Sequence, residues 1–123
     1  DKSDVDASFD RLTAMMIDGA LQNGAQGVSN CGRFPPIPAI ASHDEARINF
    51  AKEYAQQVDL PKEVLEFQML FGIRRDLQEQ LVAEGYPVRV YVPYGTEWYP
   101  YFVRRLAERP ANLWFFISNF FRG

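Results

Sequence analysis

A chain of 123 residues accommodates one domain with a modest hydrophobic core. Because 47% of the residues are hydrophobic and 24% are charged, the composition is that of a globular protein rather than a disordered one. The net charge of −3 supplies no basic field for nucleic acid, and the single cysteine, Cys31, excludes an internal disulfide and a cysteine-based metal site.

The N-terminal segment and the hydropathy of the chain argue against secretion and membrane insertion. The first residues are acidic and polar, unlike a secretory signal, and no apolar run reaches the roughly 18 residues of a transmembrane helix. The chain starts without a methionine, so we expect it to begin inside a longer reading frame. We expect a cytoplasmic protein.

Regular spacing of apolar residues predicts an amphipathic helix over residues 4–22. The apolar positions recur at three- and four-residue steps, with Asp and Arg on the opposite arc: Val5, Phe9, Leu12, Met16 and Ala20. Residues 24–36 are rich in Gly, Ser, Asn and Pro, which predicts a loop.

Three strand–helix units are predicted after this loop. In the first, residues 37–41 are a short apolar strand, and Ser42-His-Asp-Glu45 matches a capping box that opens a helix ending near Gln57. We expect this helix to point four residues inward: Ala46, Phe50, Ala51 and Tyr54.

The second unit is a strand at 65–70 and a helix at 74–84, which Gly85 closes in the left-handed conformation. The third is a strand at 88–92 and a helix at 98–108. The apolar segment that begins at Pro110 predicts one more short helix, which we expect to serve packing or assembly. The weaker alternative is that this segment contacts the inner membrane.

Strands that alternate with helices indicate an α/β fold with a parallel sheet, and near-continuous apolar strands indicate a sheet buried on both faces. Three parallel strands cannot close a barrel, and a (β/α)8 TIM barrel needs roughly 250 residues. We therefore expect residues 1–123 to form a single domain that is a partial barrel, a helix followed by about the last three units. Its raw sheet edge predicts assembly, most simply as a homo-oligomer.

Arg104 and Arg105 lie side by side on the last of these helices. Each planar guanidinium suits a carboxylate or a phosphate, and successive helix residues point about 100° apart, so the pair can grip one small anion from two directions. The alternative, which spacing alone favours, is two solvated charges, with Glu108 as an ordinary ion-pair partner of Arg104. Arg74 and Arg75 form a second pair that we interpret as solvated.

Four segments in order make the chain resemble bacterial proline dehydrogenase, the flavin enzyme that begins proline catabolism. They are Ala41-Ser-His-Asp-Glu45, Glu66-Phe-Gln-Met-Leu-Phe-Gly72, Val90-Tyr-Val-Pro-Tyr-Gly95 and Tyr101-Phe-Val-Arg-Arg-Leu-Ala-Glu108. The last contains the family's Tyr-x-x-Arg-Arg signature. The resemblance implies FAD as cofactor, L-proline as substrate, 1-pyrroline-5-carboxylate as product and a quinone as electron acceptor.

The resemblance also implies a substrate site. Arg104 and Arg105 correspond to the pair that binds the proline carboxylate. Tyr91 corresponds to a tyrosine that packs against the proline ring, Leu70 to an apolar residue of the same pocket, and Tyr101 to part of the signature. Without the resemblance, Tyr91 and Leu70 would be interpreted as barrel core.

For the cofactor, the resemblance implies that His43 and Glu108 approach FAD or support the site, although a lone histidine is more often a packed residue. No glycine-rich dinucleotide motif is present, and the family's earlier strands are absent, so we expect the isolated chain to be inactive. Two alternatives remain: a non-catalytic barrel fragment that self-associates, and a small module that binds another anion.

Overall fold

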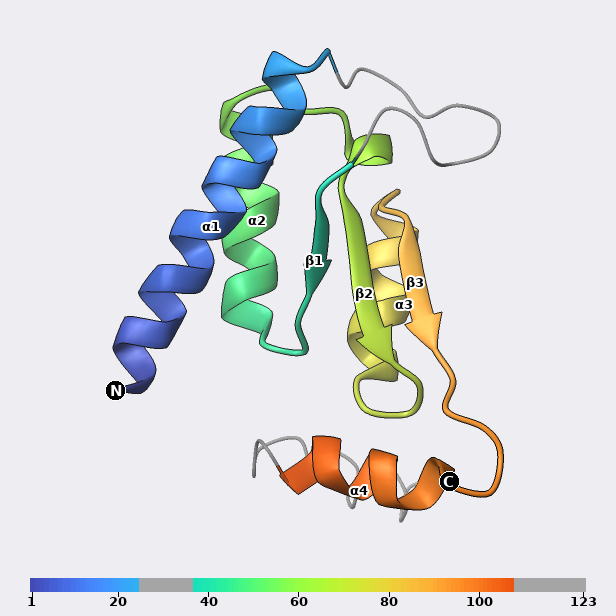
Figure 1. Ribbon diagram of the computed structural model, residues 1–123. Coiled ribbons are helices and arrows are strands. Elements are labelled where there is room, and N and C mark those ends of the chain that lie inside the picture. The colour runs from blue at the N-terminus through green and yellow to red at the C-terminus, as the bar shows by residue number, and fades with distance from the viewer. Residues whose placement is uncertain (25–36, 108–123) are drawn as a thin grey trace.

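The computed structural model of the chain describes residues 1–24 and 37–107 (Figure 1). In chain order its elements are α1 (Lys2–Gln22), β1 (Ala39–Ala41), α2 (Glu45–Gln57), the 3-10 helix η1 (Lys62–Val64), β2 (Glu66–Leu70), α3 (Arg75–Ala83), β3 (Val88–Tyr91) and α4 (Trp98–Ala107). The predicted order, one helix followed by three strand–helix units, is confirmed. The predicted helix from Pro110, residue Glu108 and most of the predicted loop lie outside the described residues.

The three strands form one parallel sheet in the order β1-β2-β3. Phe67 of the middle strand pairs with Ile40 on one side and with Val88 on the other. The predicted α/β class with a parallel sheet is confirmed, and the arrangement is compatible with part of a barrel. All three strands end at the same edge, and α4 lies beyond that edge (Figure 1).

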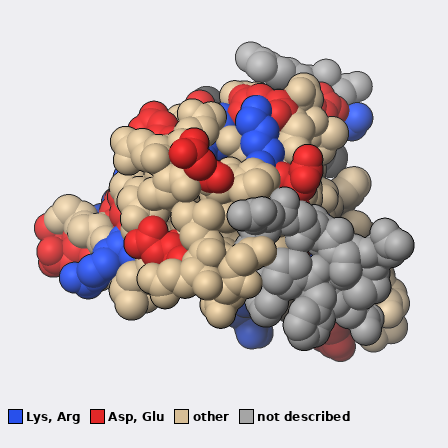
Figure 2. Space-filling view, turned by 90° about the horizontal axis from the view of Figure 1, so that it is seen from above, with Lys and Arg blue, Asp and Glu red and all other residues tan. Residues whose placement is uncertain are grey.

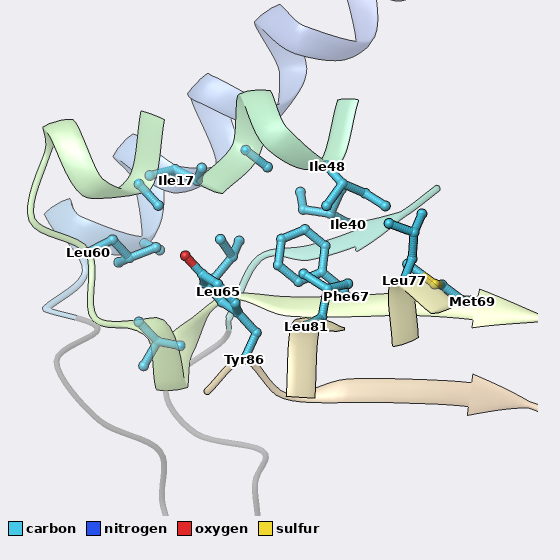
Figure 3. Packing of buried hydrophobic residues seen from close by; sticks show 14 residues of the cluster. Ile17, Ile40, Ile48, Leu60, Leu65, Phe67, Met69, Leu77, Leu81 and Tyr86 are labelled. Atoms are coloured by element: carbon cyan, nitrogen blue, oxygen red, sulfur yellow. The ribbon is translucent and has the colours of Figure 1, made fainter. Parts of the chain in front are cut away.

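The two faces of the sheet differ in chemistry because successive strand residues point to opposite sides. Phe67 and Met69 of β2 are buried with hydrophobic side chains of α1, α2 and α3 (Figure 3). The other face carries Glu66 and Gln68 from β2 and Arg89 from β3, which contact one another. The strands are therefore not continuously apolar, since polar and apolar residues alternate in β2 and β3. Every residue of β2 is nevertheless buried or half-buried, whereas β3 is exposed from Arg89 onward.

Phe67 is at the centre of the hydrophobic core. Its side chain is fully buried, and its ring meets the ring of Tyr86 edge-on, with 5.3 Å between the centroids. Figure 3 shows Ile48 of α2 and Leu77 and Leu81 of α3 near this ring. Fully burying a side chain of this size stabilises a fold by about 1.5–3 kcal/mol, so the middle strand anchors both helices.

Polar contacts with α2 fix the rotation of α1. Arg47 Nε of α2 lies 3.0 Å from Asp10 Oδ1, and its Nη1 lies 3.5 Å from Asp6 Oδ2. The hydroxyl of Tyr54 donates a hydrogen bond to Asp18 Oδ1 at 2.8 Å. Burial of Asp10 raises the pKa of its carboxyl, and the charge of Arg47 opposes that rise. Three acidic residues of α1 therefore face the neighbouring helix rather than solvent.

This rotation corrects the predicted apolar stripe of α1. The buried residues are Thr13, Ile17 and Ala20, and Phe9 is partly buried. The prediction is therefore right for Ala20 and partly right for Phe9. It is wrong for Val5, Leu12 and Met16, which are exposed. The arc that faces α2 instead carries Ile17 together with Asp6 and Asp10.

The start of α2 differs from the predicted capping box. Asp44 is the capping residue, because its Oδ1 accepts a hydrogen bond from the N–H of Ala46 at 3.0 Å. Ser42 instead accepts one from the N–H of Asp44. The residues that face inward also differ in part from the prediction. The buried residues are Ile48, Ala51 and Ala55, while Ala46 is exposed and Phe50 and Tyr54 are half-buried.

Arg74 corrects the expectation that the second arginine pair is solvated. Its side chain is 8% exposed, and its Nη2 lies 2.8 Å from Asp76 Oδ2 and 3.5 Å from Glu45 Oε2. It therefore joins the first turn of α3 to the first turn of α2. The hydrogen bond from Arg74 lowers the pKa of Asp76 despite the opposing effect of burial. Arg75, in contrast, is 81% exposed, as predicted.

Charges of both signs are mixed on the face seen in Figure 2, which looks along the sheet from the end where the strands begin. Lys52 Nζ lies 2.6 Å from Glu84 Oε2, and Lys62 Nζ donates to the backbone carbonyl of Glu84 at 2.9 Å. The hydrogen bond from Lys52 lowers the pKa of Glu84. Lys52 and Lys62 thus both contact Glu84, one through its carboxylate and the other through its backbone carbonyl.

Candidate functional site

A pocket of about 430 Å³ lies at the edge where the three strands end. The loop after β1, the ends of β2 and β3, and helix α4 all contribute to it. The residues that line it include His43, Gln68, Leu70, Tyr91, Tyr101 and Arg105. Carboxyl ends of parallel strands are where ligands bind in α/β folds, because the following loops converge there.

The structure brings together five of the seven residues expected at the site: His43, Leu70, Tyr91, Tyr101 and Arg105. Arg104 is exposed on α4 and is not among the described residues that line this pocket. Glu108 lies outside the described residues. The two neighbouring arginines therefore differ in position, since Arg105 lines the pocket and Arg104 does not.

His43 ties the loop after β1 to the end of β2. Its Nε2 accepts a hydrogen bond from the backbone N–H of Leu70 at 2.9 Å. A backbone amide can only donate, so this imidazole is neutral and has its proton on Nδ1. Its place just before α2 also disfavours a charged ring, because the helix N-terminus is electropositive.

Helix α4 brings Tyr101 and Arg105 to the pocket. The Arg105 guanidinium lies over the ring of Tyr101, 5.5 Å from its centroid, in a cation–π contact one helical turn apart. Phe102, on another side of the helix, is buried with Ile73, and Leu70 packs against both. This small apolar cluster attaches α4 to the segment after β2 and so sets the position of both pocket residues.

The hydroxyl of Tyr91 donates a hydrogen bond to Gln68 Oε1 at 3.2 Å. Gln68 Nε2 donates in turn to Glu66 Oε1 at 2.8 Å, and Arg89 donates to both oxygens of Glu66 at 2.9 and 3.2 Å. Burial raises the pKa of Glu66, but the hydrogen bonds from Arg89 and Gln68 outweigh it, so the net pKa is lowered.

Sequence reasoning missed Glu66, Gln68 and Arg89. The signal that could have found them is the alternation in Glu66-Phe-Gln-Met-Leu70 and Val88-Arg-Val-Tyr91, which places polar residues on one face with Tyr91. A second pocket of about 460 Å³ shares Leu70, Tyr91 and Tyr101 with the first. It extends toward exposed aromatic residues of the loop after β3 and of α4.

The comparison with protein families decides the relationship of this chain. A family model described as proline dehydrogenase matches residues 1–117. The chain belongs to the proline dehydrogenase family. This confirms the resemblance expected from the four ordered segments, and it assigns the chain to a family of oxidoreductases.

Curated relatives agree with this assignment. The chain is 43% identical over 123 residues to proline dehydrogenase from Deinococcus radiodurans, covering all of this chain and 35% of that protein. It is 44% identical over 115 residues to proline dehydrogenase 2 from Bacillus subtilis, covering 94% of this chain and 33% of that protein. With proline dehydrogenase 1 of the same organism the identity is 51% over 81 residues, or 66% of this chain and 27% of that protein.

The chain thus spans about a third of the length of the curated relatives that it matches. Among the described residues, no helix combines the length and the hydrophobicity that crossing a bilayer requires. Within the same residues, no group of three or more His, Cys, Asp or Glu side chains is placed to hold a metal ion.

Proposed function

We propose that the protein containing this chain oxidises L-proline to 1-pyrroline-5-carboxylate, and that proline binds in the pocket at the strand ends. One observation carries the proposal. The chain belongs to the proline dehydrogenase family, and one pocket is lined by the guanidinium of Arg105, the aromatic ring of Tyr91 and the aliphatic side chain of Leu70. Proline needs this combination, because it has a carboxylate at one end and ring methylenes at the other.

The carboxylate of proline is the group for Arg105. A guanidinium offers parallel N–H donors that match the two carboxylate oxygens, and a partly enclosed pocket strengthens the pairing relative to bulk water. Arg104 precedes Arg105 on α4 and points about 100° away from it. We propose that it supplies a second guanidinium to the carboxylate from the rim of the pocket. The cation–π contact with Tyr101 restricts Arg105 before the ligand arrives, which reduces the entropy lost on binding.

The ring of proline is the group for Tyr91 and Leu70. Both lie at strand ends and are Cα partners in the register of β2 and β3, so they form one continuous wall. An apolar wall opposite a cationic group holds a small zwitterion in one orientation. Orientation of this kind contributes up to about 7–11 kcal/mol to catalysis when the reacting atoms are near attack distance.

FAD is the cofactor that the family implies, and this chain fits only part of its binding site. His43 already uses Nε2 for the amide of Leu70, so a polar contact with FAD would have to use Nδ1. When bound, FAD supplies the two-electron oxidation that turns the ring C–N bond into an imine. The chain spans only about a third of the length of its curated relatives, so we propose that this chain by itself binds FAD weakly and turns over little or no proline.

We further propose that the three parallel strands are part of a (β/α)8 barrel, with the face bearing Glu66 and Arg89 directed inward. A quinone would accept the electrons in the complete enzyme. If this chain is produced alone, β1 and β3 each have a strand neighbour on one side only among the described residues. Unpaired strand edges favour self-association, which is the second candidate role of the isolated chain. Light scattering of the isolated chain tests it.

The experiment uses the full-length protein with proline and a soluble quinone analogue or a redox dye. Flavin absorbance between about 350 and 500 nm is expected in the purified protein. Arg105→Ala should raise KM for proline strongly, by about 100-fold or more, since it leaves a carboxylate without its charge-assisted partner. Arg75→Ala is the matched control, because Arg75 is exposed and pairs with Glu79 on α3. An Arg105→Ala variant with the wild-type KM would overturn the assignment.

A further inference from the structure

The network behind Tyr91 has only one possible hydrogen-bond direction. Arg89 can only donate, and an ionised Glu66 can only accept. Glu66 therefore accepts a hydrogen bond from the amide NH2 of Gln68, which directs the amide oxygen of Gln68 toward Tyr91. The hydroxyl of Tyr91 has a single proton, which this contact uses.

The anchor of the network is more buried than its end. Glu66 is 9% exposed and is held by the guanidinium fork of Arg89, whereas Tyr91 is 48% exposed and borders the pocket. The lowered pKa of Glu66 agrees with an ionised carboxylate in the network. The position of the proton at Tyr91 is therefore set from inside the sheet.

We propose that Glu66 is a positioning residue that acts through Gln68 to hold the Tyr91 hydroxyl with its lone pairs toward the pocket. The hydroxyl of Tyr91 then accepts a hydrogen bond from a ligand rather than donating one, while the ring of Tyr91 remains part of the apolar wall. Small zwitterions that bring an N–H or O–H to this wall are favoured, and ligands that bring only an acceptor there are disfavoured. The inference rests on the proposed function, because it assigns the ligand at Tyr91.

The test combines variants of these residues in the full-length protein. Glu66→Gln puts an amide beside Gln68, so the carboxamide of Gln68 can rotate by about 180° and exchange its oxygen and nitrogen. Gln68→Met removes the acceptor for the Tyr91 hydroxyl but keeps the contact of Glu66 with Arg89. Both variants should raise KM for proline by at least about threefold in the wild-type background. Neither should change KM further in a Tyr91→Phe background, because the hydroxyl through which they act is gone.

Glu63→Gln is the matched control, since Glu63 is an exposed carboxylate three residues before Glu66. It should leave KM unchanged in both backgrounds. Effects of Glu66→Gln and Gln68→Met that are equally large with and without the Tyr91 hydroxyl would overturn the inference. So would a wild-type KM in the Gln68→Met variant, which retains the Arg89–Glu66 pair.

A second readout separates this inference from the proposed function. Urea unfolding of wild type, Gln68→Met, Tyr91→Phe and the double variant measures the coupling of the two side chains without any substrate. Non-additive midpoints support the network, and additive midpoints overturn it. If the wild-type protein does not oxidise proline, the proposed function fails, and the unfolding cycle alone decides whether Gln68 holds Tyr91.

Discussion

The backbone N–H of Leu70 donates a hydrogen bond to Nε2 of His43 over 2.9 Å, although 27 residues separate the two in the chain. The bond connects the loop after β1 with the end of β2, where both residues line the pocket. It satisfies a backbone donor at the point where the ladder of the sheet ends. His43 therefore supports the shape of the pocket, whatever its contact with a cofactor.

Replacing His43 with alanine should destabilise the fold, because the Leu70 amide then loses its acceptor. The expected loss is about 1–3 kcal/mol in the free energy of unfolding, the usual cost of an unsatisfied, partly buried group. His43→Gln offers a side-chain oxygen at a similar reach and should lose less. Urea unfolding of the two variants checks this, and equal losses in both would contradict the role of the hydrogen bond.

Phe67→Ala should be far more damaging than Phe71→Ala. Phe67 is fully buried between the sheet and two helices, so truncation leaves a cavity and costs about 3–5 kcal/mol. Phe71, one residue past β2, is 59% exposed, and its truncation should stay within about 0.5 kcal/mol. Thermal and urea unfolding measure both. Similar losses at the two positions would mean that the core is misplaced.

The two arginines at the start of α3 give a second matched pair. Arg74→Met should cost about 1–3 kcal/mol, because Asp76 and Glu45 lose a shared partner where α2 and α3 begin. Arg75→Met removes an exposed pair with Glu79 and should cost less than about 1 kcal/mol. The measurement is the urea midpoint at low and at high salt. A cost at Arg74 no larger than that at Arg75 would show that the buried contact contributes little.

Stability should fall in acid, partly through Glu66. The folded pKa of Glu66 is below its ordinary value of 4.5, so folding favours the carboxylate. Its contribution is complete above that ordinary value and is lost as the pH falls through the lower folded pKa. Glu66→Gln should therefore lose less stability than wild type between about pH 5 and about pH 3. If the urea midpoints of wild type and Glu66→Gln fall by the same amount across this pH range, Glu66 does not contribute to the loss of stability in acid.

Element order could be predicted from the sequence because the signals are local. Gly85 ends α3 in the left-handed conformation, with φ +93°, as its position after the helical pattern predicts. The strands and their parallel order followed from the alternation with helices. The start of α2 was misplaced, since Ser42 and Asp44 both qualify as caps and only the packed loop selects Asp44.

The candidate site was predicted in part. Tyr91 and Arg105 came from the family resemblance and line one pocket, whereas Arg104 is not among the described residues that line it. Gln68 was missed. The alternation in β2 indicates that it shares a face with Glu66, but its hydrogen bond to Tyr91 follows only from the register of β2 with β3. The exposure of Leu12 was also missed, since two arcs of α1 are apolar enough to face inward and contacts with α2 choose between them.

The sequence by itself determined the order of helices and strands and the family, because caps, glycines, periodicity and a short signature act within a few neighbouring residues. Only the tertiary structure decided which residues meet at the pocket and which charges are buried. His43 meets Leu70, Tyr91 meets Gln68, and Arg74 meets Glu45 across 27, 23 and 29 residues of chain. Such contacts depend on the register of the sheet and the rotation of each helix, which packing of the whole core sets.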